Sequence, residues 1–180
     1  MHVKGNAWLS RAAAMEKEFG AERWKQFVTT QKASFLQAPV MPISRIDVDE
    51  FLSVNDAMVR EFYAGDEKAW WRFGEMSAQW ALANQLRGLF AEHEGKRFLF
   101  FSPTIYKNYF DAGELVVEST PATVDLIIRN VGRTHVYFEY SIIGFAVGGL
   151  KVLKVEAAHE CIKGFSKGDD EVRYRFAVTK

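Results

Sequence analysis

Three neighbouring segments decide the fold: Tyr137-Phe-Glu-Tyr-Ser-Ile-Ile-Gly-Phe-Ala-Val-Gly-Gly-Leu-Lys-Val-Leu153, Lys154-Val-Glu-Ala-Ala-His-Glu-Cys-Ile-Lys-Gly164 and Glu171-Val-Arg-Tyr-Arg-Phe-Ala-Val178. Residues that share one helical sector recur through the first segment: Tyr137, Tyr140, Ile143, Gly144, Val147, Gly148 and Leu150. The period then changes to two, with one face formed by Leu153, Val155, Ala157, His159 and Cys161 and another by Val172, Tyr174, Phe176 and Val178. These patterns predict a helix that leads into a two-stranded hairpin with a polar turn over residues 164–170.

Gly144 and Gly148 lie one turn apart on the same side of the predicted helix. A glycine inside a helix costs about 1 kcal/mol relative to alanine. Because glycine has no Cβ, it also lets another backbone come close. The pair therefore predicts that this helix packs closely against a neighbouring backbone.

Helical spacing of apolar residues predicts five further helices, over residues 7–19, 22–30, 47–63, 66–94 and 103–110. Gly20 is placed to end the first of them, Asp47 followed by Glu50 resembles a capped helix start, and Ser102-Pro103 fits the start of the last. A second hairpin over residues 115–128 turns at Thr120-Pro121. The fold class predicted is α+β, with N-terminal helices followed by a small antiparallel sheet of about four strands and a packed helix, in a single domain over residues 1–180.

Composition excludes several classes of function. The 23 basic and 23 acidic residues cancel, so no net charge favours nucleic acid as a partner. No apolar run approaches the roughly 18 residues of a membrane span, and no signal-peptide core is recognisable near Asn6 and Arg11. We therefore expect no nucleic-acid partner, no membrane span and a cytoplasmic location.

No strong catalytic motif is present. His159 and Cys161 stand two apart on one predicted strand face, but no second pair follows at a metal-site spacing. A buried thiol beside an imidazole is the favoured interpretation, and a nucleophilic Cys161 would need an activating base. We expect neither a catalytic nor a metal site, no cofactor, and a protein that is not an enzyme.

Aromatic residues are the remaining signal. Many rings on converging helices around a small sheet can enclose an apolar cavity whose hydroxyls orient a ligand. The residues predicted to line such a ligand-binding site are Trp80, Tyr106, Tyr109, Tyr137 and Tyr140. A filled core with an aromatic dimer surface explains the same rings equally well.

Several segments also resemble a known family: Val3-Lys4-Gly5, Phe19-Gly-Ala-Glu22, Phe73-Gly-Glu-Met-Ser-Ala78 and Ile105-Tyr-Lys-Asn-Tyr-Phe-Asp-Ala-Gly113. They look like a myxobacterial and deltaproteobacterial family of uncharacterised proteins. Residues 144–178, with Glu160-Cys161 and Lys163-Gly164, are similar to the 4-vinyl-reductase-like domain. That domain is related in fold to the haem-nitric-oxide-binding sensors and to Bet3-type vesicle-tethering subunits.

The resemblance implies a bacterial sensory or adaptor module in signal transduction. The haem sensors carry a tyrosine-serine-arginine signature, whereas Tyr140-Ser141 is followed here by Ile142-Ile143, and His93 is the one candidate for a haem-ligating histidine. The tail also lacks the second cysteine of its relatives. The resemblance thus argues against a haem and favours a small apolar or amphipathic ligand. A ligand-free homodimer or scaffold for a signalling partner is the alternative, and a haem-based gas sensor is the second alternative.

Overall fold

The computed structural model describes residues 1–178. The α-helices within this range are α1 (Gly5–Phe19), α2 (Ala21–Thr30), α3 (Val48–Tyr63), α4 (Lys68–Ala83), α5 (Gly95–Lys107) and α6 (Val136–Val152). The strands are β1 (His2–Lys4), β2 (Arg45–Asp47), β3 (Glu114–Ser119), β4 (Thr123–Arg129), β5 (Ala157–Lys163) and β6 (Val172–Val178). Two short 3-10 helices cover Ser34–Leu36 and Phe165–Lys167. The predicted α+β class is confirmed.

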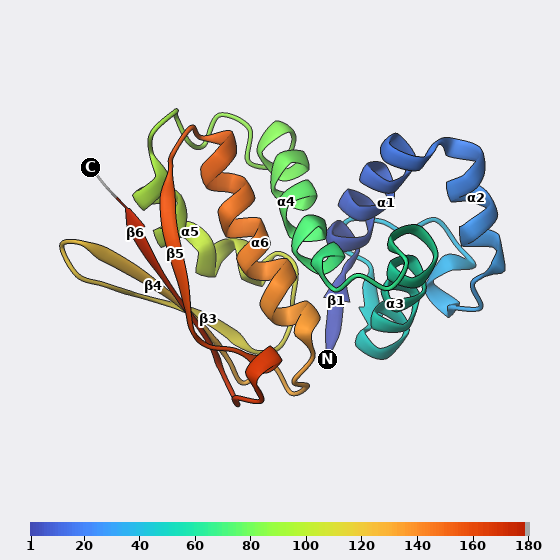
Figure 1. Ribbon diagram of the computed structural model, residues 1–180. Helices are drawn as coiled ribbons and strands as arrows, with labels where there is room; N and C mark the ends of the chain where they lie inside the picture. The colour runs from blue at the N-terminus through green and yellow to red at the C-terminus, as the bar shows by residue number, and fades with distance from the viewer. Residues whose placement is uncertain (179–180) are drawn as a thin grey trace.

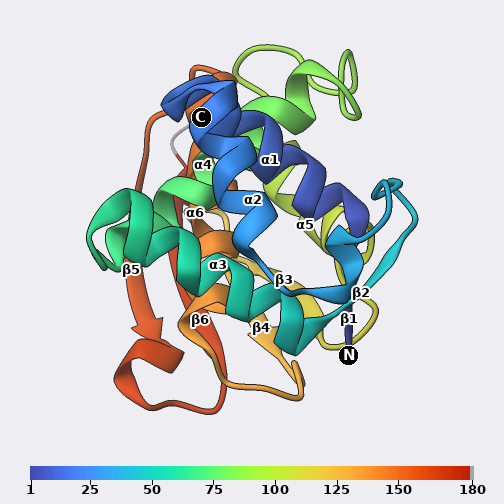
Figure 2. The ribbon, with the colours of Figure 1, turned by 90° about the vertical axis from the view of Figure 1, so that its right-hand side faces the viewer.

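The main sheet is antiparallel, with strand order β3-β4-β6-β5. Its register places Leu126 of β4 opposite both Val117 of β3 and Tyr174 of β6. Figure 1 shows α6 lying across one face of this sheet, with α4 on the other side of α6 and α1, α2 and α3 farther from the sheet. Figure 2 views the molecule from the side of these three helices. The helices are thus segregated to one face of the sheet, as is usual in α+β folds.

Glycines bring α4 and α6 into backbone contact, as the spacing of Gly144 and Gly148 predicts. A Cβ built on Gly144 would lie 2.3 Å from the Trp71 carbonyl oxygen, and one built on Gly148 would lie 2.6 Å from the Glu75 Cα. From the opposite helix, a Cβ on Gly74 would lie 2.1 Å from the Ser141 carbonyl oxygen. We call Gly74, Gly144 and Gly148 the glycine seam.

Local caps set where two of the helices begin. The Asp47 carboxylate accepts hydrogen bonds from the backbone amides of Asp49 and Glu50, so the predicted start of α3 is confirmed. At α6, the Nδ1 atom of His135 accepts a hydrogen bond from the Tyr137 amide at 3.0 Å. Neutral imidazole therefore serves as the N-cap of the helix that lies on the sheet.

The prediction of one helix over residues 66–94 is wrong. The helix ends at Ala83, Asn84 leaves helical geometry, and Gly88 and His93 both have positive φ angles, of 77° and 67°. Apolar spacing misled the prediction because Leu86 is still buried although the backbone around it is no longer helical.

The helix predicted over residues 103–110 is also wrong in its bounds, because α5 begins at Gly95 and carries Pro103 inside it. A proline within a helix removes one backbone hydrogen bond and is usually a start signal. Here the Ser102 hydroxyl donates to the Phe98 carbonyl oxygen one turn earlier instead of capping a helix start.

In the last hairpin, β5 begins only at Ala157, since Leu153 caps α6 and Lys154 adopts a positive φ of 58°.

One pairing in the fold lies outside the predicted elements. The strands β1 and β2 pair with each other in antiparallel register, but each has three residues, which is too short a run for an alternating pattern to show.

No helix within residues 1–178 is both long and apolar enough to cross a membrane.

Replacing Gly144 by alanine tests the glycine seam. Alanine gains about 1 kcal/mol of helix propensity, but its Cβ meets backbone that cannot move without separating α4 from α6. We expect the Gly144→Ala variant to lose about 2 kcal/mol or more of unfolding free energy in urea denaturation. Val152→Ala, at an exposed position near the end of α6, is the control and should change stability little. An unchanged or more stable Gly144→Ala protein would contradict the close packing.

Titration of His135 gives a pH dependence of known sign. Burial lowers the pKa of His135 below its ordinary value of 6.5, and the nearby carboxylate of Asp56 offsets this only in part. As the pH falls through about 6.5, the unfolded chain takes up this proton before the folded protein does, so stability decreases. We expect the melting temperature to fall between about pH 7.5 and 5.5. The fall should be smaller in His135→Asn, which keeps a side-chain acceptor for the cap, and unchanged in the exposed control His93→Asn. Equal pH dependence in all three proteins would refute the role of His135.

Candidate functional site

A small cavity lies where the helices meet the sheet. Its volume is about 50 Å³, and its walls come from α1, α4, α5, α6, β3, β4 and the segment after α5. The lining residues are Ala7, Arg11, Gly74, Ser77, Ser102, Ile105, Tyr106, Tyr109, Phe110, Leu115, Leu126, Tyr137, Ser141, Ile142, Phe145 and Ala146. Gly74 and Ser141 belong to the contact between α4 and α6, so the glycine seam forms one edge of this cavity.

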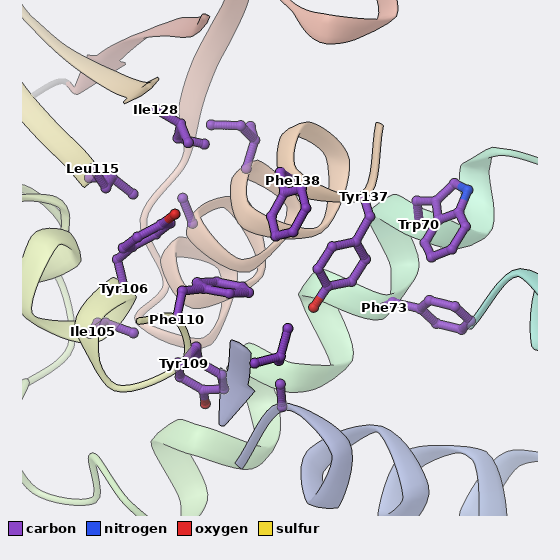
Figure 3. Close-up of a cluster of buried hydrophobic side chains, with 14 of the residues drawn as sticks. Trp70, Phe73, Ile105, Tyr106, Tyr109, Phe110, Leu115, Ile128, Tyr137 and Phe138 are labelled. Atoms are coloured by element: carbon purple, nitrogen blue, oxygen red, sulfur yellow. The ribbon is translucent and has the colours of Figure 1, made fainter. Parts of the chain in front are cut away.

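Three tyrosines reach the cavity from different elements. Tyr106 is on α5, Tyr109 follows that helix, and Tyr137 is in the first turn of α6. Figure 3 shows the Tyr106 hydroxyl pointing toward Leu115 and the Tyr109 hydroxyl pointing away from Phe110. Burial raises the pKa of all three phenols, so each stays protonated at neutral pH and can donate a hydrogen bond.

The polar groups around the cavity differ in whether they have partners. The Tyr106 hydroxyl donates to the Ala112 carbonyl oxygen at 3.0 Å, and the Ser141 hydroxyl donates to the Trp70 carbonyl oxygen at 2.9 Å. The Ser77 hydroxyl lies 3.1 Å from that of Ser10. By contrast, the buried hydroxyl of Tyr109 has no hydrogen-bond partner within residues 1–178.

Arg11 brings a positive charge to the cavity wall. The residue is only 2% exposed, and burial lowers the pKa of its guanidinium. Its Nη1 donates to the Asn55 side-chain oxygen, and its guanidinium carbon lies 4.0 Å from the centre of the Phe73 ring. Nε has no partner in the part of the chain that the structure describes.

The structure brings three of the five predicted ligand-binding residues together at this cavity: Tyr106, Tyr109 and Tyr137. Trp80 instead lines a surface hollow between α1 and α4, and Tyr140 lies beside Trp71 in another hollow. Sequence reasoning missed Arg11. The signal was present, because Arg11 is three residues after Trp8 and four before Met15, on the apolar stripe of α1.

His159 and Cys161 lie outside the cavity. The exposed His159 ring stacks on Trp71 with 5.4 Å between centroids, and the Cys161 thiol lies 3.4 Å from the Lys163 carbonyl oxygen. Over residues 1–178, no three His, Cys, Asp or Glu side chains group as metal ligands. His93 is exposed in the connection between α4 and α5 and is not a lining residue.

The sequence matches no protein-family model, and no curated protein matches it. Solved structures match the whole fold at low identity. An H-NOX protein from S. oneidensis has a TM-score of 0.77 at 10% identity, covering 98% of this chain and 96% of that one. A single-substitution variant of Tt H-NOX has a TM-score of 0.76 at 17% identity, covering 98% of this chain and 95% of that one. An oxygen-binding H-NOX domain related to soluble guanylate cyclases has a TM-score of 0.75 at 16% identity, covering 98% and 95%. At these identities the likeness establishes a shared H-NOX fold.

A haem does not fit the cavity of this chain. Pockets for drug-sized ligands measure roughly 300–1,000 Å³, whereas the cavity here is about 50 Å³. No histidine or cysteine of residues 1–178 lines it, although these are common haem-iron ligands. Among the lining tyrosines, burial disfavours the phenolate that would bind iron.

Adding haem to the purified protein tests this mismatch. We expect no shifted Soret band that survives gel filtration, since neither the volume nor an axial ligand is available. The measurement is the ratio of Soret to protein absorbance after filtration, compared with a His93→Ala variant that removes the sequence candidate for an iron ligand. A stoichiometric band lost in that variant would show that the chain opens to hold a haem.

Proposed function

We propose that this chain is a non-enzymatic sensory domain that binds a small molecule, and not a haem, in the cavity between its helices and its sheet. The observation that carries the proposal is the convergence of Tyr106, Tyr109, Tyr137 and Arg11 on one small cavity. The shared fold supports it, because one structural neighbour is described as an oxygen-binding H-NOX domain. Small-ligand sites commonly combine apolar walls with a few convergent polar groups.

Binding in this cavity would couple two halves of the molecule. Arg11 belongs to α1, whereas Leu115 and Leu126 belong to the sheet, so one ligand would contact elements far apart in the sequence. A ligand that contacts both halves favours the conformations in which they are close together. The resulting change in the relative position of the helices and the sheet is what a signalling partner of a bacterial cytoplasmic sensor would detect.

Filling the cavity tests the proposed site. Ala146 is buried on α6 and lines the cavity, so Ala146→Val would occupy part of the space. For the wild type we expect propanol, propionamide or propionate to raise the melting temperature by about 3–6 °C at roughly ten times the dissociation constant. Ala146→Val should lose this rise, whereas Ala13→Val, at an exposed position of α1, should keep it.

The outcome separates two functions. A rise that Ala146→Val retains would place the ligand elsewhere. No rise with any of the three solutes, together with a ligand-free dimer in native mass spectrometry, would favour a protein-interaction module instead.

A further inference from the structure

Arg11 differs from the other buried charged side chains, Asp125 and Glu139, because one of its nitrogen atoms, Nε, has no hydrogen-bond partner within residues 1–178. Asp125, on the sheet, is paired with both Arg173 and Arg175 at 2.6–2.8 Å. Glu139 accepts hydrogen bonds from the hydroxyls of Tyr174 and Ser166 and from the Ser166 amide. No Asp or Glu side chain within residues 1–178 pairs with Arg11.

The groups around Arg11 hold the guanidinium without neutralising it. The side-chain oxygen of Asn55, which is neutral, accepts a hydrogen bond from Arg11. The side-chain nitrogen of Asn55 donates to the Phe51 carbonyl oxygen at 2.7 Å. The Phe73 ring covers one face of the guanidinium, and the Tyr137 ring centre lies 5.9 Å away. Buried charges are generally paired, because an isolated ion in an apolar interior is strongly disfavoured. A ligand that supplies a negative charge would remove this penalty.

Two buried polar groups on the wall have no hydrogen-bond partner within residues 1–178, and both are able to donate. Arg11 Nε–H can only donate, and the protonated Tyr109 hydroxyl donates as well. The hydroxyls of Ser77, Ser102, Tyr106 and Ser141 already bond to another hydroxyl or to carbonyl oxygens. The Tyr137 phenol lies beside Arg11 but is neutral, so it does not balance the charge of the guanidinium. The wall therefore offers unpaired donors and a cation without a negative charge, and a carboxylate supplies both strong acceptor atoms and the missing charge.

The rest of the wall fits a short alkyl group. Ile105, Leu115 and Leu126 line the cavity with apolar side chains. A dry protein cavity of roughly 150 Å³ accommodates benzene, and the cavity here is about a third of that volume. Its ligand should therefore contain only a few non-hydrogen atoms.

We propose that the cavity binds a short-chain monocarboxylate of the size of acetate or propionate, with the carboxylate at Arg11 and Tyr109 and the alkyl group against Leu115 and Leu126. This inference rests on the proposed function, since it names the ligand class of the same site. Arg11 then acts as the anchor that selects the ligand by charge.

Isothermal titration of the full chain with propionate and with propionamide at constant ionic strength tests the inference. The two probes match in size and differ in charge. We expect propionate to bind about ten- to a hundredfold more tightly, as hydrogen bonds to charged groups contribute about 1.5–3 kcal/mol. Arg11→Gln should abolish this preference while propionamide binding persists, and Tyr109→Phe should weaken propionate binding severalfold.

Arg23→Gln is the matched control, because Arg23 also lies over aromatic rings, at 4.7 Å from Phe62 and 5.4 Å from Phe19, but is exposed on α2. It should leave both affinities unchanged. Equal binding of the two probes by the wild type would overturn the carboxylate inference and leave the proposed function standing. If neither probe binds, and if Ala146→Val does not change the melting-temperature rise caused by any solute, both the carboxylate inference and the proposed function are overturned. The comparison of propionate with propionamide binding by the wild type tests the carboxylate inference even if Arg11→Gln does not fold.

Discussion

Backbone contact between α4 and α6 is the constraint on which the rest of this structure depends. At three positions, Gly74 of α4 and Gly144 and Gly148 of α6, the facing helix leaves no room for a Cβ. Because α6 lies on the sheet, this contact also fixes how far the remaining helices stand from the strands. Close-packed interiors respond to even small added groups, so the position of α4 is set by the absence of side chains at the seam.

The same contact limits what the interior can hold. Gly74 and Ser141 border the cavity, whose volume of about 50 Å³ excludes a haem in an otherwise H-NOX-like fold. What remains is a small space with apolar walls and one buried cation. Structural likeness at 10–17% identity shows that the fold is shared. The chemistry of the site depends instead on individual residues such as Arg11 and Tyr109.

Local patterns in the sequence predicted the helix α6, its glycines, the two hairpins and the cap at Asp47, because each depends on neighbours within a few residues. The end of α4 and the start of α5 could not be predicted from spacing, since buried residues continue past Ala83. Which aromatic rings converge depends on tertiary packing. Tyrosines on α5 and α6 therefore meet at one cavity, while Trp80 lies in a separate hollow.

Heteronuclear NMR of the arginine side chains tests most directly whether Arg11 is a buried cation without a counter-charge. The expected result is an Nε–H resonance, absent from Arg11→Gln, that exchanges slowly with solvent and shifts on addition of propionate but not of propionamide. Slow exchange follows from burial of Nε without access to water. An Arg11 resonance that exchanges as fast as those of exposed arginines and responds to neither solute would contradict the assignment of this cavity as a carboxylate site.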